Sequence, residues 1–281
     1  MSAAVLVIGA TGTTGGRVAR LLAGRGLRVR AASRRATPVA GCEAVRFDWY
    51  DPETFEEALR GVDRVYLVPP VGDPGPAAVM LPFLERARAS GVSRAVLLGS
   101  SAIASGGPAV GRVQQALPGL FDAWAVLRPS WFMQNFTGDH AHARSIREHG
   151  TILTATGEGR VAFVDADDIA AVAVHALTAE GDAGGDLVLT GPEALSYDEA
   201  AAIISEVTGR PVTHRRVTHE QLRDRLAGIL PPEFAAVLAG LDRSIAEGAE
   251  DRVTDTVERL TGRPPLSLRA HVEHAMTAVG G

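Results

Sequence analysis

Three glycines near the start of the chain, Gly9, Gly12 and Gly15, have the spacing of a loop that binds phosphate. They lie between the apolar run 5–8, which is typical of a buried strand, and residues 18–22, which carry apolar side chains at helical spacing. Such a turn lets a pyrophosphate approach the backbone and meet free N–H groups at the positive end of the helix dipole. The pattern predicts nucleotide binding, with a merely flexible turn as the alternative.

The residues after the second apolar run, 27–32, indicate which nucleotide this is. Folds that bind NAD carry Asp or Glu here to hold the ribose 2′-hydroxyl, whereas this chain has Ser33, Arg34 and Arg35. Arg34 can pair with a 2′-phosphate and stack its planar guanidinium on adenine, and a carboxylate would repel that phosphate. The sequence therefore favours NADP(H) over NAD(H), with two solvated surface arginines as the alternative.

Asp48 follows the third apolar run, 44–47. Its carboxylate could accept a hydrogen bond from the adenine amine, or it could cap the helix predicted over 54–59. The sequence leaves both roles open.

The segment 131–135 has the side chains of a pocket for a flat ligand. Aromatic and thioether groups suit a heteroaromatic or quinone molecule and can stack on a cation. The alternative is that Phe132 and Met133 belong to the core and only Trp131 or Asn135 contacts a ligand. The candidate substrate-binding residues are thus Trp131, Phe132, Met133 and Asn135.

Two nearby histidines, His140 and His142, are two residues apart, so helical spacing would direct them to different faces. No further Cys or His completes a plausible ligand set around them. No metal site is predicted.

All 28 basic residues are Arg, and the chain contains no Lys. This excludes a lysine-dependent phosphate loop, Schiff-base catalysis and the Tyr-Lys pair of short-chain dehydrogenases. Reduction of a ketone needs a proton for the developing alkoxide, whereas a cationic iminium needs only the hydride. The absence therefore favours imine reduction over carbonyl reduction, although Ser, His or water can also relay protons. A genome-wide preference for Arg codons is the alternative cause.

The elements that would position these residues alternate between strands and helices. Apolar runs predict strands over 5–8, 27–32, 44–47, 64–68, 95–98 and 125–127, with helices over 54–59 and 79–89 among the connections. This rhythm is typical of an α/β, Rossmann-like, doubly wound parallel sheet, in which ligands bind at the carboxyl ends of the strands. The residues that follow the strands are therefore expected to line the pocket.

The second half predicts a smaller α/β substrate-binding lobe. We expect the acidic residues 165–168 to cap a helix over 169–177, and Ser196 to cap a helix over 197–207. Strands are predicted over 187–189 and 212–217, a helix over 233–247, a mobile connector over 246–251 and a last long amphipathic element over 252–260. The expected division is a nucleotide-binding domain over 1–155 and a cap region over 156–281, interleaved with the sheet.

Composition restricts the partners. The 281 residues are 46% hydrophobic with a net charge of −5, which argues against a nucleic-acid surface. The single Cys42 cannot form an internal disulfide, and no apolar run approaches the roughly 20 residues that span a bilayer. We expect a cytoplasmic monomer or homodimer that binds a small-molecule substrate and neither nucleic acid nor membrane.

Several segments together resemble a known family. GATGTTGG, SRR, FDW, YLVPP, VLLGSSA and LRPSWFMQNF resemble the NmrA-like branch of atypical short-chain dehydrogenases. The likeness covers nearly the whole chain and is strongest to the ergot-alkaloid festuclavine and agroclavine dehydrogenase subgroup, whose members reduce cyclic iminium intermediates with NADPH. Other NmrA-like proteins are quinone or azo reductases, or non-catalytic NADP sensors.

The resemblance implies roles for individual residues. Ser100 and Ser101 lie where related enzymes carry a catalytic Ser, and residues 111–115 lie where they carry Tyr and Lys. Arg34 and Ser33 would lie at the 2′-phosphate, and Asp48 and Trp49 would flank adenine. The implied cofactor-binding set is completed by Gly9, Thr11, Gly12, Thr13, Thr14 and Gly15 at the pyrophosphate, by Val68, Pro69 and Pro70 beside the nicotinamide ribose, and by Pro129.

These observations favour an NADPH-dependent reductase of a small cyclic imine, iminium or conjugated metabolite. The absent catalytic pair leaves open a regulatory protein that senses NADP(H). A non-redox isomerase or cyclase on the same fold is a third possibility.

Overall fold

The computed structural model describes residues 4–279 and divides them into two compact units. The first comprises the chain up to Pro129, then Ala166–Val188 and Arg259–Gly262. The second comprises Ser130–Asp165, Leu189–Glu258 and the chain from Arg263 onward. The chain thus leaves the first unit after Pro129 and returns to it twice. No helix within residues 4–279 is both long and apolar enough to cross a membrane.

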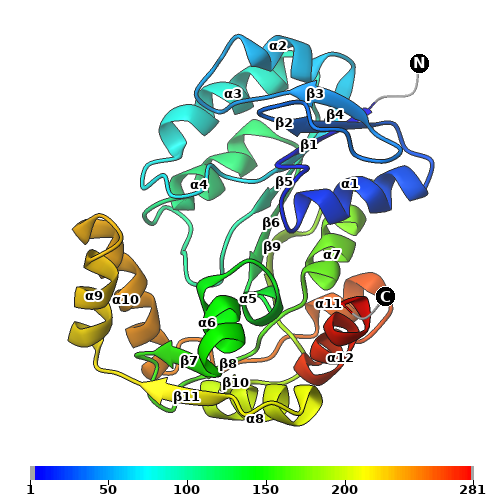
Figure 1. Cartoon of the computed structure of the whole chain (residues 1–281). Helices are drawn as coiled ribbons and strands as arrows, with labels where there is room; N and C mark the ends of the chain where they lie inside the picture. Colours follow the sequence, from blue (N-terminus) through cyan, green and yellow to red (C-terminus); the bar gives the residue numbers. More distant parts are fainter. Residues whose placement is uncertain (1–3, 280–281) are drawn as a thin grey trace. The chain divides into compact units, whose positions relative to one another are not determined.

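Runs of apolar β-forming residues build a seven-stranded sheet in the order β3-β2-β1-β4-β5-β6-β9 (Figure 1). All five residues of β1 are buried, as expected for a strand covered on both faces. The pairs from β3 to β6 are parallel, which confirms the predicted doubly wound fold. The strands are β1 (Ala4–Ile8), β2 (Val29–Ser33), β3 (Glu43–Arg46), β4 (Val62–Leu67), β5 (Arg94–Leu98), β6 (Ala123–Pro129) and β9 (Gly185–Leu189).

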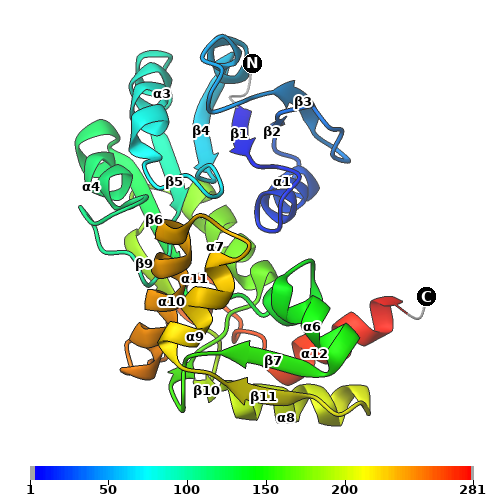
Figure 2. The same cartoon turned by 60° about the vertical axis from the view of Figure 1, so that its left-hand side comes forward.

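Helices cover both faces of this sheet. Figure 2 shows α3 and α4 on the opposite side of the sheet from α1. The core beneath α2 and α3 contains an aromatic cluster of Phe47, Trp49, Phe55 and Phe83, with neighbouring ring centroids 4.9 to 5.4 Å apart. The helices of the first unit are α1 (Gly15–Gly24), α2 (Thr54–Leu59), α3 (Ala77–Ala89), α4 (Gly111–Leu120) and α7 (Ala166–Thr178).

Arg94 shows why a charged residue can begin a central strand. It is only 8% exposed, and its guanidinium donates hydrogen bonds to the carbonyl oxygens of Ala176, Ala179 and Gly181 at 2.7 to 2.9 Å. These carbonyls lie at the C-terminal end of α7, where the helix dipole favours a cation. Burial of Arg94 is therefore compensated, and the bond fixes α7 to the sheet.

The second unit consists of two small sheets and several helices. β7 (Thr151–Thr154) pairs in parallel with β11 (Thr213–Arg216), and β8 (Arg160–Val161) pairs antiparallel with β10 (Leu195–Ser196). Ser196 caps the next helix in a reciprocal capping box with Glu199, as the sequence predicted. The helices are α5 (Gln134–Thr137), α6 (Ala141–His149), α8 (Tyr197–Thr208), α9 (His219–Ala227), α10 (Pro232–Ala246) and α12 (Leu268–Val279). The first half of α11 (Thr256–Thr261) belongs to the second unit, and its second half, from Arg259 onward, belongs to the first.

The C-terminal segment differs from the prediction of one long element over 252–260. The chain is irregular up to the short α11, and the long helix is α12. Leu268 and Val272, one helical turn apart, are both buried and give α12 its apolar side. The stretch predicted as a mobile connector contains Glu250, which is only 3% exposed, so at least this residue is anchored.

The expectation that His140 and His142 point to different faces is wrong. His140 is the N-cap of α6 with an extended backbone, so helical spacing does not apply to it. Its Nδ1 accepts a hydrogen bond from the backbone N–H of His142, and the two ring centroids are 4.9 Å apart. His142 packs between the rings of Phe136 and Tyr197. No group of three metal-ligating side chains occurs in the described chain.

Burial, followed by the neighbouring His140 and His214, lowers the pKa of His142 to about 3. An unfolded His has a pKa near 6.5, so the unfolded chain takes up a proton first as the pH falls. We expect His142 to reduce the free energy of unfolding by about 2 kcal/mol between pH 6.5 and 5. Urea unfolding at several pH values should show this loss in the wild type and a smaller slope in His142→Phe. Equal slopes would contradict the prediction.

Candidate functional site

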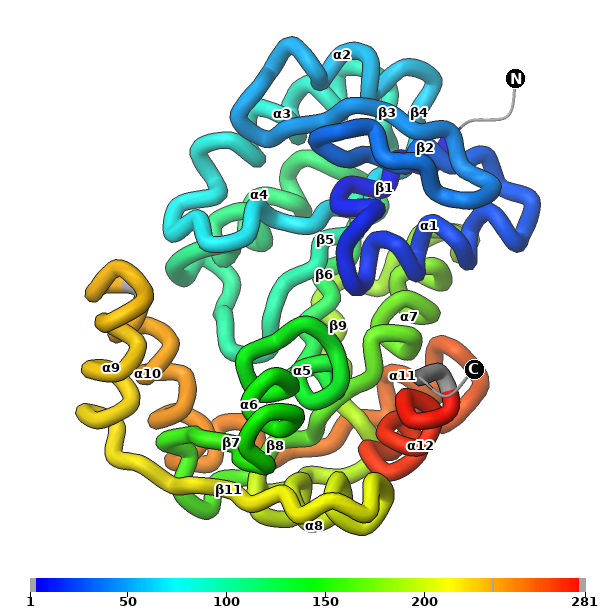
Figure 3. The backbone as a smooth tube through the Cα atoms, in the orientation of Figure 1, coloured from blue at the N-terminus to red at the C-terminus, as the bar shows by residue number. Residues whose placement is uncertain are grey.

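The backbone between β1 and α1 can be formed only by glycine at two positions. Gly9 has a φ of +74°, a left-handed conformation that side chains disfavour. A Cβ on Gly15 would lie 2.2 Å from the carbonyl oxygen of Gly9, which is far inside van der Waals contact. The helix therefore begins directly against the end of the strand, and Figure 3 shows the sharp turn that joins them.

The rim of this turn is open. Thr11, Gly12 and Thr13 are exposed, while Thr14 and Gly15 are buried beneath them. The first turn of α1 has no acidic residue, and its N-cap, Thr14, makes no side-chain cap. The Thr14 side chain therefore does not cap the N-terminal N–H groups of α1, and no carboxylate in the first turn offsets the positive end of the helix dipole. Such a helix N-terminus suits a pyrophosphate.

Arg17 fixes this loop and was missed by the sequence analysis. Its Nη1 donates to the carbonyl oxygen of Thr13 at 2.8 Å, and its Nε pairs with Asp167 at 2.9 Å. Asp167 lies in the first turn of α7, so the ion pair joins the loop to a second helix. The sequence predicted Asp167 as one of the acidic residues that cap a helix. The pairing of Asp167 with Arg17 could not be read from the sequence, because the two residues are 150 positions apart.

The end of β4 lies beside the same loop. The Cβ of Val68 is 3.0 Å from where a Cβ of Gly9 would be. The indole N–H of Trp49 donates to the carbonyl oxygen of Val68 at 3.0 Å, and the ring itself is only 8% exposed within the aromatic cluster. The Trp49 side chain therefore fixes the backbone at the end of β4 from within the core. Val68, Pro69 and Pro70 are half-buried at the sheet edge.

The end of β2 presents two exposed cations. Arg34 and Arg35 are exposed, and Arg34 pairs with no side chain or carbonyl of residues 4–279. The hydroxyl of Ser33 accepts a hydrogen bond from the backbone N–H of Thr37 at 2.9 Å and so shapes the turn. Arg34 is sterically available to an anion.

Asp48 does not cap α2. The N-cap of α2 is Glu53, and the Asp48 Oδ1 accepts a hydrogen bond from the backbone N–H of Tyr50 at 3.1 Å. This bond closes a local turn and leaves the carboxylate half-exposed at the sheet edge. The adenine role stays a prediction.

Ser100 and Ser101 are held in place by Arg128, which the sequence analysis did not single out. Its guanidinium donates to the carbonyl oxygens of Ser100 and Ser101 at 3.4 and 3.0 Å and pairs with Asp186 at 2.9 Å. The backbone N–H of Ser101 donates to the carbonyl oxygen of Pro129 at 3.0 Å, which joins the ends of β5 and β6. Ser100 is half-buried and Ser101 is buried.

No tyrosine replaces the missing acid on α4. Gln114 faces the end of β5, is 4% exposed, and its Nε2 has no hydrogen-bond partner in the described chain. Tyr66 lies wholly within the core, where burial raises its pKa, and burial likewise raises the pKa of Tyr197 in the second unit. The exposed Tyr50 donates its hydroxyl to Asp73 at 2.7 Å, and this bond raises its pKa.

In the second unit, the segment predicted to bind substrate is fixed by Val164. Val164 donates to the carbonyl oxygen of Trp131 at 2.9 Å, and the N–H of Met133 donates back to Val164 at 3.0 Å. Met133 is 1% exposed and belongs to the core, as the alternative for this residue held. Trp131, Phe132 and Asn135 are only half-buried.

Asp165, which precedes α7, also contacts side chains of α5 and α12. Its Oδ2 is 2.5 Å from Nδ1 of His271 and accepts a hydrogen bond from Gln134 at 3.1 Å. The other ring nitrogen of His271 is 2.8 Å from the hydroxyl of Thr137. These bonds attach α12 to α5.

Gly15→Ala tests the loop. The added Cβ must displace the Gly9 carbonyl, so we expect NADPH to bind at least about tenfold more weakly, a loss of about 1.4 kcal/mol. Gly24→Ala is the matched control at the other end of α1, because a Cβ there meets nothing within 4 Å. Isothermal titration measures both affinities, and circular dichroism checks folding. Unchanged NADPH affinity in a folded Gly15→Ala protein would refute the loop assignment.

Comparison with known proteins agrees with this geometry. The NmrA-like family model matches residues 121–266, and an NAD(P)H-binding model matches residues 9–123. An uncharacterized oxidoreductase, YesF of Bacillus subtilis, is 46% identical over 265 residues, which cover 94% of this chain and 92% of that protein. Festuclavine synthase II of Penicillium roqueforti is 37% identical over 283 residues, covering 96% and 97% of the two chains.

Among solved structures, the triphenylmethane reductase of Citrobacter sp. complexed with NADP(H) superposes with a TM-score of 0.80. The two sequences are 25% identical, and the match covers 98% of this chain and all of that one.

Proposed function

Because the chain belongs to the NmrA-like family and is an NAD(P)H-dependent oxidoreductase, we propose a finer function for it. The protein transfers a hydride from NADPH to a small cyclic imine, iminium or conjugated quinone- or enone-like molecule. It does so without a Tyr-Lys pair.

The observation that carries this proposal is that α4 has no tyrosine that could act as a general acid. The chain has no Lys, and the α4 residue that lies against Gly99, directly after β5, is Gln114, whose side chain is an amide. Bound NADPH supplies a hydride. A hydride that adds to the carbon of an iminium sends the C=N π electrons to nitrogen, and the cation becomes a neutral amine with no proton consumed. A site that lacks the Tyr-Lys proton donor suits this acceptor better than a ketone.

The protein's own residues then bind and orient. The loop from Gly9 to Gly15 binds the pyrophosphate, and Arg17 stabilises this loop through its bond to the Thr13 carbonyl. Arg34 pairs with the 2′-phosphate. In the second unit, the half-buried rings of Trp131 and Phe132 supply apolar faces that can stack on a flat or cationic acceptor. The names of the two relatives above, festuclavine synthase and triphenylmethane reductase, are compatible with this class of acceptor.

Arg34→Asp tests the choice of nucleotide. Replacing the cation by a carboxylate should weaken NADPH binding by at least about tenfold and leave NADH affinity within about twofold. Arg25→Asp is the control, because Arg25 is an exposed residue at the end of α1. Fluorescence titration of the wild type and both variants with NADPH and with NADH measures the six affinities. If NADPH affinity is the same in Arg34→Asp and wild type, the selectivity argument is wrong.

The reaction itself is tested with a permanently charged acceptor, N-methyl-3,4-dihydroisoquinolinium. We expect NADPH oxidation whose rate is flat between pH 6 and 9 and shows no solvent isotope effect, because no proton is transferred. A matched ketone, 1-tetralone, should react at least about 100-fold more slowly. Stopped-flow absorbance at the NADPH band gives both rates.

Tight NADPH binding with no oxidation by iminium, enone or quinone would overturn the proposal. That outcome would favour the NADP(H)-sensing alternative, which a redox-dependent pull-down of one partner would then test.

A further inference from the structure

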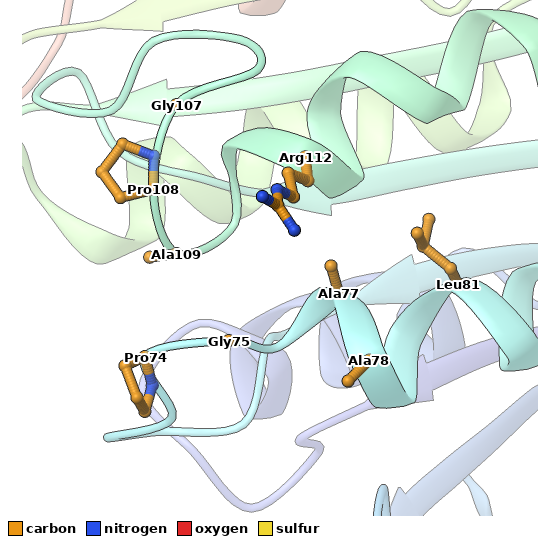
Figure 4. A pocket seen from close by; sticks show the side chains of 9 residues that line it. All are labelled: Pro74, Gly75, Ala77, Ala78, Leu81, Gly107, Pro108, Ala109 and Arg112. Atoms are coloured by element: carbon orange, nitrogen blue, oxygen red, sulfur yellow. The ribbon is translucent and has the colours of Figure 1, made fainter.

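The first unit contains a cavity of about 510 Å³ whose lining residues do not include those of the glycine loop (Figure 4). Its two walls are the connection from β4 into α3 and the connection from β5 into α4. Both connections follow the carboxyl ends of their strands, the edge at which parallel sheets bind ligands. The lining residues are Pro74, Gly75, Ala77, Ala78, Leu81, Gly107, Pro108, Ala109 and Arg112.

Arg112 is the one charged residue among these nine. Figure 4 shows its guanidinium extending from α4 into the space that separates α4 from α3. Arg112 is exposed, and no side chain or carbonyl within residues 4–279 pairs with it. The cavity therefore carries a positive charge that this part of the chain does not neutralise, although the whole chain has a net charge of −5.

Asp73, the acidic residue that directly precedes the lining residue Pro74, has other partners. Its Oδ1 accepts a hydrogen bond from the backbone N–H of Gly75, and its Oδ2 accepts one from the hydroxyl of Tyr50, both at 2.7 Å. Asp73 thus shapes the loop that enters α3 rather than lining the cavity. An anion in the cavity would meet the Arg112 guanidinium without a competing carboxylate among the lining residues.

The rest of the lining suits a flat apolar group. Ala77, Ala78 and Ala109 end at Cβ, and Leu81 adds an aliphatic side chain one turn further along α3. The volume lies in the range of small-molecule pockets, about 300 to 1,000 Å³. An aromatic ring fits between such walls while its acidic substituent reaches the planar fork of the guanidinium.

The backbone of one wall is strained. Ala109 has a φ of +51°, one of two non-glycine residues with positive φ in the described chain. The loop is held closed by hydrogen bonds from Gly106 N–H to the Gly111 carbonyl and from Gly111 N–H to the Pro108 carbonyl, at 2.8 and 3.1 Å. Strained non-glycine residues cluster at ligand sites, where the surrounding structure enforces a shape.

We propose that this cavity binds a flat aromatic carboxylate, with Arg112 as the partner of the carboxylate and the alanines as the walls for the ring. The proposal concerns binding alone and does not depend on hydride transfer. It assigns to the protein an affinity for aromatic acids that the nucleotide loop and the segment 131–135 do not account for.

The probe is 2-naphthoate, with neutral 2-naphthamide as its matched analogue, titrated by fluorescence into protein without nucleotide. We expect the wild type to bind the acid at least tenfold more tightly than the amide. Arg112→Met should lose that tenfold preference and keep its affinity for the amide, while Arg112→Lys should keep part of the preference. Arg88→Met, which removes an exposed Arg near the other end of α3, is the control and should behave as wild type.

A second variant locates the ring. Ala77→Phe places a ring inside the cavity, so it should weaken both probes by at least tenfold while thermal unfolding stays near that of the wild type. The proposal fails if Arg112→Met binds 2-naphthoate as tightly as the wild type, if the wild type does not distinguish acid from amide, or if folded Ala77→Phe binds both normally. Because no turnover is measured, these outcomes are independent of whether the protein reduces an imine.

Discussion

The close approach of Gly15 to the carbonyl of Gly9 is the constraint on which the nucleotide edge of the sheet depends. With no Cβ at position 15, helix α1 begins in contact with the end of β1, and Thr11, Gly12 and Thr13 form the exposed rim of the loop. The neighbouring contacts build on this position. Val68 packs against Gly9, and Trp49 holds the Val68 carbonyl from within the aromatic core.

In this chain without lysine, arginine side chains stabilise several turns by bonding to main-chain carbonyls. Arg17, Arg94 and Arg128 each donate to main-chain carbonyls at the end of a helix or strand, and two of them also pair with a carboxylate. The guanidinium has five donors in a fixed plane, so one side chain can satisfy several carbonyls where a chain turns. What arginine does not supply is an acid near neutral pH, because its proton is held too tightly. A chain whose basic residues are all Arg therefore has these donors at its turns and lacks the Lys of a Tyr-Lys pair.

The second unit is organised by buried polar side chains. His142 is kept neutral by its burial between aromatic rings, and His214 is bonded to Thr154 and lies close to Asp198. Asp165, His271 and Thr137 form a second chain of hydrogen bonds that attaches the last helix. Each buried polar atom of this kind needs a partner because desolvation without one is unfavourable. The segment 131–135 is held by the backbone bonds of Val164 to Trp131 and Met133 and by the bond from Gln134 to Asp165.

The sequence by itself determined the parallel sheet, the glycine loop and the cationic end of β2, because these depend on local patterns: apolar runs, helical spacing and a turn that admits only glycine. It also determined that no Lys could take part in chemistry. Only the tertiary structure decided that Arg17 holds the loop, that Arg128 holds the serines, and that Trp49 and Met133 lie in the core. It likewise brought His140 against His142 and set Arg112 in a cavity. These features depend on contacts between residues far apart in the chain or on a backbone conformation at a helix end, and neither is encoded in the spacing of residue types.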